Sequence, residues 1–172
     1  MLADAGCRHV LVGHPECRAM GETDADVHAK LRAALDAGLS PILCCGETSA
    51  QREQGVTEAC VTMQLCAALQ GVTPDTLRRI VVAYAPPWAI GSGCAASPEL
   101  AQEGCAGVRA VLRRLYGARL VRSVVVLYGG SMDEHNARQL LAQPDIDGGL
   151  VGSASLKAER FLQIVEAANL IQ

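Results

Sequence analysis

Residues 79–93 read RIVVAYAPPWAIGSG, and this stretch decides the fold class. Its first half is a continuous apolar run, which is typical of a strand buried on both faces of a parallel β-sheet. Its second half combines two prolines, the single tryptophan and small residues, a composition that predicts a hinged loop. The next residues, Ser97, Pro98 and Glu99, suit the N-cap, first-turn proline and first-turn acid of a helix. The stretch therefore predicts a strand, a loop and a helix in that order.

The same order of strand and helix repeats along the chain. Each of five apolar runs is followed by apolar residues at helical spacing. These runs are residues 7–13, 39–45, 79–85, 123–130 and 148–152. We therefore expect an α/β fold with about five parallel strands and helices outside them. The length of 172 residues suits one domain, which we place at residues 1–172.

The composition excludes several classes of partner. The chain has 15 basic and 18 acidic residues, and its basic residues form no stripe of the kind that binds nucleic acid. It contains no apolar run long enough to span a membrane, and its first residues do not resemble a secretory signal. We expect a cytoplasmic protein that binds neither nucleic acid nor membrane.

The eight cysteines are predicted to be free thiols. We expect one of them, Cys17, in a loop and the other seven as small core residues. Those seven are Cys7, Cys44, Cys45, Cys60, Cys66, Cys94 and Cys105. The adjacent pair Cys44 and Cys45 and the four scattered histidines lack the spacing of a zinc site, so no metal site is predicted.

The residues that follow the predicted strands should meet in space, because the carboxyl ends of parallel strands share one edge of the sheet. They are Gly13-His14, Gly46-Glu47, Ala85-Pro86-Pro87-Trp88, Gly129-Gly130-Ser131 and Gly152-Ser153. Two of the five ends place a serine directly after a glycine, and such corners let backbone N–H groups approach an anion closely. The sequence therefore predicts a phosphate site at this edge.

Seven segments in order resemble the triosephosphate isomerase family, the (β/α)8 barrel that interconverts dihydroxyacetone phosphate and glyceraldehyde 3-phosphate. They are MLADAG, VGHPECRAMGETD, ILCCGET, PPWAIGSG, SPELAQE, YGGSM and DGGLVGSASLK. The resemblance implies a partial barrel made of the last five βα units, with the first three units absent. Such a barrel would be open where those units are missing.

The resemblance also implies roles for particular residues. His14 would be the electrophile that polarises the substrate carbonyl as a neutral imidazole, and Glu16 would be a secondary carboxylate. A histidine that only satisfies hydrogen bonds at a strand end is the alternative for His14. The substrate phosphate would be held by the backbone N–H groups of Gly91, Ser131, Gly152 and Ser153. Neither a metal nor an organic cofactor is implied.

A lid over the substrate is implied by the loop after the third strand. Lid closure would exclude water and bring Gly91 to the phosphate, with Gly93 in the hinge. The lid residues are Pro86, Pro87, Trp88, Ala89 and Ile90, together with Tyr128, which would bond to the closed lid. Trp88 as a core anchor and Tyr128 as a packing residue are the alternatives.

The clearest departure from the family is Ala85, which stands where the family has a glutamate as general base. A methyl group cannot accept a proton, and a positioned base is typically worth about 10²–10⁴ in rate. Neither Glu16 nor Glu47 is predicted to replace it, because Glu47 is best interpreted as a structural acid. The absent first strand would also have supplied an asparagine and a lysine that contact substrate.

Three functions follow from these observations. The first is a triosephosphate isomerase of glycolysis and gluconeogenesis whose activity is impaired by Ala85 and by the absent strand. The second is a phosphosugar-binding pseudoenzyme that keeps only the anion site, and the third is an isomerase of another sugar phosphate. The expected ligand is triose phosphate or a similar phosphosugar. The family forms homodimers through a loop of the absent part, so its usual dimer is not expected here. Because an open barrel leaves strand edges and apolar faces uncovered, we expect self-association or a separately encoded N-terminal part to cover them.

Overall fold

Five parallel strands form a single sheet in chain order in the computed structural model, which describes residues 1–91 and 95–171. The strands are β1 (His9–Val12), β2 (Ser40–Cys45), β3 (Val81–Tyr84), β4 (Val126–Tyr128) and β5 (Gly148–Gly149). Every neighbouring pair is parallel, with Leu11 opposite Ile42 and Leu127 opposite Gly148. The predicted parallel α/β sheet is therefore confirmed.

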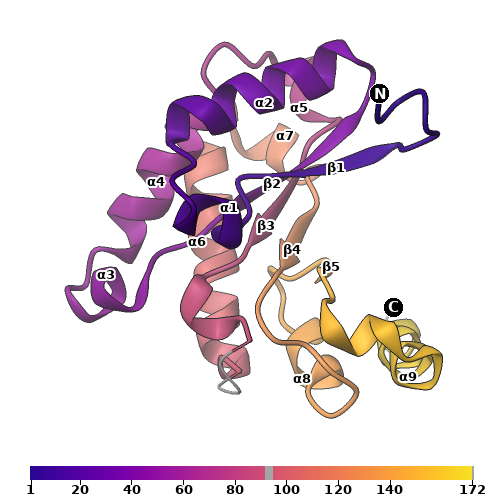
Figure 1. The fold of residues 1–172 in the computed structure, drawn as a ribbon. Coiled ribbons are helices and arrows are strands. Elements are labelled where there is room, and N and C mark those ends of the chain that lie inside the picture. The colour runs from indigo at the N-terminus through magenta and orange to yellow at the C-terminus, as the bar shows by residue number, and fades with distance from the viewer. Residues whose placement is uncertain (92–94, 172) are drawn as a thin grey trace.

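Helices connect the strands and lie along one face of the sheet (Figure 1). The long helices of this layer are α2 (Asp24–Asp36), α4 (Thr57–Ala68) and α6 (Pro98–Tyr116), and α9 (Ala158–Asn169) follows β5. The shorter helical elements are α1 (Pro15–Ala19), α3 (Ser49–Glu53), α5 (Pro74–Leu77), η1 (Pro87–Ala89), α7 (Ala118–Val121), α8 (Ala137–Leu141) and η2 (Ser153–Leu156). In the described ranges, no helix is both long enough and apolar enough to cross a membrane.

The main core lies between the sheet and this helix layer. Leu31 of α2, Leu65 of α4 and Leu112 of α6 are fully buried there with Val82 and Val126 of the sheet. Helix α6 begins where the sequence predicts, because the Ser97 side chain accepts a hydrogen bond from a backbone N–H in the first turn. Burial on this face supplies the main driving force that holds each strand to its helix.

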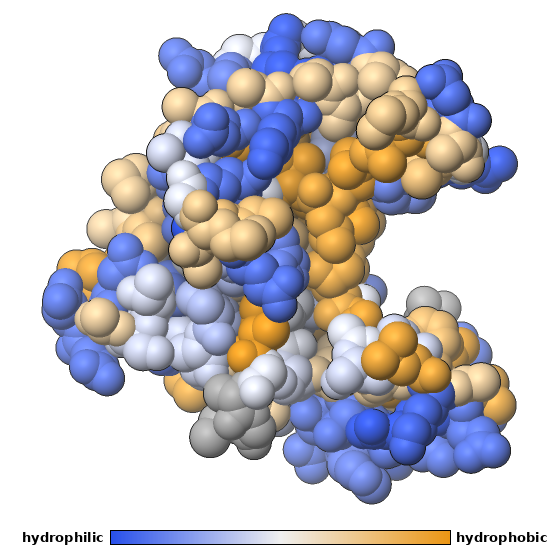
Figure 2. Space-filling model, in the orientation of Figure 1, coloured by the Kyte–Doolittle hydropathy of each residue, from blue (hydrophilic) through white to orange (hydrophobic). Residues whose placement is uncertain are grey.

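The other face of the sheet is open. A small second cluster of buried residues, Cys44, Ala83 and Ala85, lies on this face, but Leu11 at its edge is 47% exposed. Figure 2 shows hydrophobic residues gathering in the hollow between the part that contains α2 and the part that contains α8 and α9. Strands β1 and β5 each pair on one side only in the described structure. The partial barrel is therefore not closed, as predicted.

Strand β5 is shorter than expected. The apolar run at residues 148–152 pairs with β4 at only Gly148 and Gly149, whereas the residues after them turn away into η2. Glycine contributes no side chain to pack against a neighbour, and β5 has a neighbour on one side only. Only a short ladder with β4 therefore joins β5 to the sheet in the described structure.

The cysteine prediction is only partly correct. The seven described cysteines are all free, and Cys44, Cys45, Cys60 and Cys105 are buried as expected. Cys7 and Cys66 are exposed, however, so they are not core residues. Cys17 lies in helix α1 rather than in a loop, because the proline at the first position of α1 starts a helical turn directly after the strand. Cys94 and the hinge residue Gly93 lie outside the described residues.

Candidate functional site

A cavity of about 610 Å³ lies at the carboxyl edge of the sheet. Residues that follow β1, β3, β4 and β5 line it together, although these strands are separated by long helices. Seven of the residues singled out from the sequence meet there: His14, Glu16, Ile90, Gly91, Ser131, Gly152 and Ser153. Convergence of the strand ends is therefore confirmed for four of the five strands.

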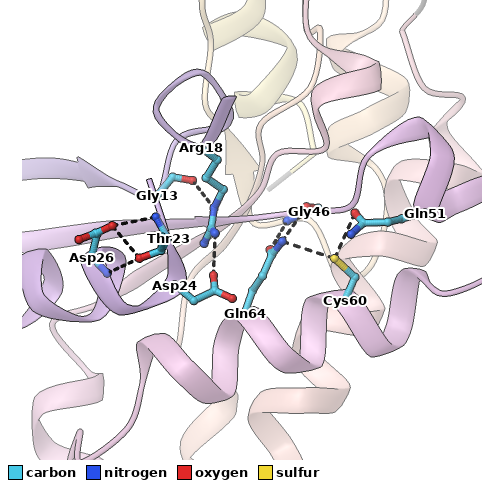
Figure 3. Close-up of polar contacts among 9 residues, drawn as sticks. All are labelled: Gly13, Arg18, Thr23, Asp24, Asp26, Gly46, Gln51, Cys60 and Gln64. Atoms are coloured by element: carbon cyan, nitrogen blue, oxygen red, sulfur yellow. Dashed lines mark hydrogen bonds and ion pairs between the residues drawn. The ribbon is translucent and has the colours of Figure 1, made fainter. Parts of the chain in front are cut away.

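His14 reaches the cavity because the chain turns sharply at Gly13. Gly13 has a φ of +76°, and a Cβ there would stand 3.0 Å from the carbonyl oxygen of Cys44. Arg18 fixes this turn, since its Nε donates to the Gly13 carbonyl at 3.1 Å and its guanidinium pairs with Asp24 at 2.6 Å (Figure 3). A residue with a side chain at position 13 would be strained, so glycine is needed directly before the histidine.

The hydrogen bonds of His14 determine which ring nitrogen is available. The backbone N–H of Glu16 donates to Nδ1 of His14 at 3.4 Å. Nδ1 is therefore the acceptor, and in a neutral imidazole the proton lies on Nε2. An Nε2–H group can donate to a carbonyl oxygen of a bound ligand. The Glu16 carboxylate lies 4.0 Å from Nδ1, but its side chain is 81% exposed, so its field at the ring is weakened by solvent.

The residues after β5 bring backbone N–H groups to the same cavity. Gly152 and Ser153 lie at the start of η2, and among the described residues no partner is seen for their backbone N–H groups. Ser131 differs, because its N–H donates to the carbonyl of Ala89 at 2.7 Å. Of the predicted backbone donors, Ser131 is thus already engaged by the loop, and its hydroxyl remains as a donor.

Ala85 lies beside the cavity and does not line it. Its side chain is fully buried against Cys44 and Ala83, and its N–H donates to the Cys45 carbonyl at 2.7 Å. Gly46 packs against the same loop, because a Cβ there would come within 2.8 Å of the Pro86 backbone. Position 85, where the resemblance implies a general base, therefore provides only a methyl group to the interior.

The predicted lid residues divide into two groups. Ile90 and Gly91 line the cavity, whereas Pro86, Pro87, Trp88 and Ala89 do not. Trp88 donates from Nε1 to Oε1 of Glu47 at 3.0 Å, and the guanidinium of Arg52 lies 4.8 Å from the centre of its ring. Trp88 also packs against the main core, so in this structure it anchors the loop.

Glu47 is the buried structural acid that the sequence predicts. Its carboxylate accepts the hydroxyl of Tyr84 at 3.0 Å and the guanidinium of Arg52 at 3.1 Å, in addition to the indole of Trp88. Burial, and then the Glu47 carboxylate, raise the pKa of Tyr84 well above its usual range. The charge of this buried acid is thus compensated by one cation and two neutral donors.

Tyr128 is the aromatic residue that is predicted to bond to the closed lid. It is fully buried at the end of β4, and burial raises its pKa to about 12, with the Ala96 backbone opposing that rise. Its hydroxyl nevertheless has no partner at full hydrogen-bonding geometry among the described residues. A buried hydroxyl without a partner is uncommon.

A second polar network supports the base of the loop. Gln64 of α4 closes a pair of hydrogen bonds on Gly46, accepting from its N–H at 2.9 Å and donating to its carbonyl at 3.1 Å. Cys60 links Gln64 to Gln51, as Figure 3 shows. This network satisfies the backbone of Gly46 at a point where the sheet has ended. The network therefore fixes Gly46, which packs against the backbone of Ala85 and Pro86.

Sequence reasoning missed three polar residues that line the cavity: Asp133, Asn136 and Arg160. Asn136 donates to the Ser131 carbonyl at 3.1 Å and accepts from the N–H of Asp133 at 2.9 Å, so it braces the loop after β4. Arg160 extends from the first turn of α9. No glycine corner or motif marks these residues in the sequence, since they lie several positions beyond the strand ends.

The arrangement defines a class of protein. It is an α/β protein whose parallel sheet carries, at its carboxyl edge, a cavity lined by an imidazole and by backbone N–H groups that have no partner among the described residues. Such a site suits a small phosphorylated ligand with a polar group at its other end. Among the described residues no group of three or more histidine, cysteine, aspartate or glutamate side chains is placed to hold a metal ion.

Comparison with known proteins identifies the family. The model of the family described as triosephosphate isomerase matches residues 1–168. The triosephosphate isomerase of Chloroflexus aurantiacus is 52% identical over 166 residues, which cover 96% of this chain and 66% of the relative. That of Hydrogenovibrio crunogenus is 48% identical over 170 residues, which cover 98% and 67%. The chain belongs to the triosephosphate isomerase family, and it spans about two thirds of the length of the curated relatives it matches.

Proposed function

We propose that this chain binds a triose phosphate in the cavity and that its proton transfer is impaired. The observation that carries the proposal is the contrast between His14 and Ala85. His14 lines the cavity and its Nε2 has no hydrogen-bond partner among the described residues, whereas Ala85 is a buried methyl group beside it. Binding groups for both ends of a phosphosugar are thus present, while the group that would move the proton is lacking.

The phosphate would lie against the start of η2. The N–H groups of Gly152 and Ser153 have no protein partner among the described residues, and the hydroxyls of Ser131 and Ser153 add donors. Arg160 contributes a positive charge to the same cavity. Closure of the loop would add the N–H of Gly91, since Gly91 already lines the cavity.

His14 would act on the carbonyl end of the sugar. In the isomerisation, a base removes a proton from the carbon next to the carbonyl, and charge develops on the carbonyl oxygen. An Nε2–H donor stabilises that charge. Glu16 is the nearest carboxylate to His14, but it is mostly exposed and is not aimed by any other hydrogen bond in the described structure. Glu16 therefore does not supply an efficient substitute for the base.

The same observations favour a phosphosugar-binding pseudoenzyme as the second candidate. A third, an isomerase of another sugar phosphate, would use the same fold and would equally need a base. Intact isomerase activity would place the protein in glycolysis and gluconeogenesis, in the cytoplasm. Self-association that covers the open sheet belongs to the same set of proposals.

A binding experiment tests the ligand. Titration calorimetry with dihydroxyacetone phosphate and with inorganic phosphate should give saturable binding to the unmodified chain. Ser153→Asp places a negative charge among the proposed phosphate donors and should weaken binding by about tenfold or more. Ser49→Asp is the matched control, because Ser49 is exposed in the first turn of α3. Equal affinity of both variants and the unmodified chain would overturn this site.

A turnover experiment separates the candidate functions. Ala85→Glu and its neutral control Ala85→Gln would be compared in this chain, and again in a chain extended at its N-terminus to the length of the relatives. Isomerisation of triose phosphate restored by glutamate alone, by about 10²-fold or more, supports an impaired isomerase. Binding without any restored turnover favours the pseudoenzyme.

A further inference from the structure

An ion pair connects the two loops that form the proposed phosphate wall. Nε of Arg160, in α9, donates to both carboxylate oxygens of Glu134, at 2.7 and 2.8 Å. Glu134 lies in the loop after β4, three residues after Ser131. Arg160 follows Ser153 by seven residues. The contact therefore joins the Ser131 loop to the segment that begins with Gly152 and Ser153.

The environment of this pair differs from that of an ordinary surface contact. The Glu134 side chain is only 13% exposed and the Arg160 side chain 37% exposed. Asp133 and His135 also lie near the pair, with Nε2 of His135 3.7 Å from Oε1 of Glu134. The Arg160 guanidinium holds the pKa of the Glu134 carboxyl below its usual range, so the pair stays ionised at neutral pH.

Two kinds of contact join the Ser131 loop to the segment after β5: apolar packing, with Met132 against Gly149, and this ion pair. Asn136 and Asp133 brace the Ser131 loop internally, and the Ser155 hydroxyl braces η2 by donating to the Gly152 carbonyl at 2.7 Å. Each loop is thus held within itself. The Glu134 to Arg160 contact is an ion pair that crosses from one to the other and borders the cavity.

We propose that Glu134 and Arg160 are positioning residues that set the distance between the Ser131 and Ser153 sides of the phosphate site. The inference rests on the proposed function, because it concerns the affinity of that same site. A phosphate is held well only when its donors stand at the right separation. Loss of the pair would let the loop after β4 move away from η2 and would weaken the binding of phosphate.

Glu134→Ala gives a test in which charge and position predict opposite results. Removing an acid next to the cavity should strengthen anion binding if only charge matters, because the electrostatic potential becomes more positive. If the pair positions the loops, the same change should weaken the binding of inorganic phosphate by about two- to fivefold, the range of a partly exposed ion pair. Glu58→Ala is the matched control, since Glu58 forms an exposed ion pair with Arg114 elsewhere.

A double-mutant cycle with Arg160→Ala completes the experiment. In the Arg160→Ala background, Glu134→Ala should no longer weaken binding, because the contact is already lost. Thermal unfolding followed by circular dichroism verifies that each variant is folded. Phosphate binding that is unchanged or tighter in Glu134→Ala overturns the inference and leaves the proposed function standing. Failure of the unmodified chain to bind phosphate overturns both.

Discussion

Trp88 donates its indole N–H to Glu47, with Nε1 3.0 Å from Oε1. This hydrogen bond links the loop after β3 to the end of β2. It also places the tryptophan away from the cavity. The Glu47 carboxylate accepts hydrogen bonds from Tyr84 and Arg52 as well. The loop is therefore held by a buried acid, while its following residues, Ile90 and Gly91, face the site. The stability of the fold and the position of the loop after β3 therefore both depend on the Glu47 carboxylate.

We expect Glu47→Ala to destabilise the chain by about 2–4 kcal/mol. The change leaves Arg52 and the Tyr84 hydroxyl without their buried partner, and breaking such a group is costly. Urea unfolding followed by circular dichroism gives the free energy, and fluorescence of Trp88, the single tryptophan, should change at the same time. Glu53→Ala removes an exposed acid of the same helix region and should cost less than about 0.5 kcal/mol. Equal stabilities of the two variants would contradict this assignment.

Gln64→Met should lower the free energy of unfolding by about 1–3 kcal/mol. Methionine has a similar volume, but it leaves both the N–H and the carbonyl of Gly46 without their hydrogen bonds. Gln70→Met, at an exposed position just beyond the same helix, is the control and should have little effect. Chemical denaturation of the two variants in parallel measures the difference. If the free energy of unfolding of Gln64→Met were no lower than that of Gln70→Met, the Gly46 contacts would be shown to be unimportant.

The sequence predicts the sheet well because a buried parallel strand has a clear apolar pattern. The runs that contain β2 and β3 pair on both sides, and both are where the sequence places them. At the edge, β5 falls short of its predicted run because glycines and one-sided pairing weaken the ladder. Cys7 and Cys66 were misplaced because neighbouring apolar residues do not determine which side of a segment faces solvent.

The site is predictable only where residues directly follow strands. His14 and Ser153 line the same cavity because parallel strands end at one edge of the sheet. Arg160 reaches the same cavity from the first turn of α9 and Asn136 from the residue before α8, so their direction depends on how these helices pack. The hydrogen bond between the Ser131 N–H and Ala89 depends on loop conformation, which no local pattern encodes.

Stability should fall as the pH rises above about 9. Burial raises the pKa of Cys44 and of Cys105 to about 12, and that of Tyr128 to about 12, above the ordinary values of 9.0 and 10.0. In the unfolded chain these groups lose their protons first, so the folded state binds more protons between pH 9 and 12. Stability is then fully present below pH 9 and decreases by up to about 1.4 kcal/mol per pH unit for each group.

Urea unfolding at several pH values between 8 and 11 measures this decrease. Cys105→Ala removes one of the titrating groups and should make the decrease shallower, although it also lowers stability at pH 8 by leaving a small cavity. Cys66→Ala, at an exposed position, should leave the slope unchanged. A slope that is identical in all three proteins would show that the buried thiol does not contribute.

The open face of the sheet predicts self-association. Leu11 on β1 is 47% exposed and Leu162 on α9 is 56% exposed, so each end of the sheet presents apolar surface beside a strand that pairs on one side only. Exposed apolar patches and free strand edges favour association. A second copy of this chain can place its β1 edge beside β5 and α9 of the first, because all strands are parallel. We therefore expect sedimentation velocity to show association that increases with concentration.

Substitutions at the two ends test this contact between copies. Leu11→Lys and Leu162→Lys should each weaken association by about tenfold, the effect of losing one buried leucine. Met63→Lys, at an exposed position of α4 away from these ends, should not. If the β1 end of one copy meets the α9 end of the next, an equal mixture of the two variants retains one unmodified junction and should associate more strongly than either variant alone. This mode of assembly would be excluded if the chain stayed monomeric at every concentration, or if the mixture associated no more strongly than either variant alone. The open face would then have to be buried by a different partner.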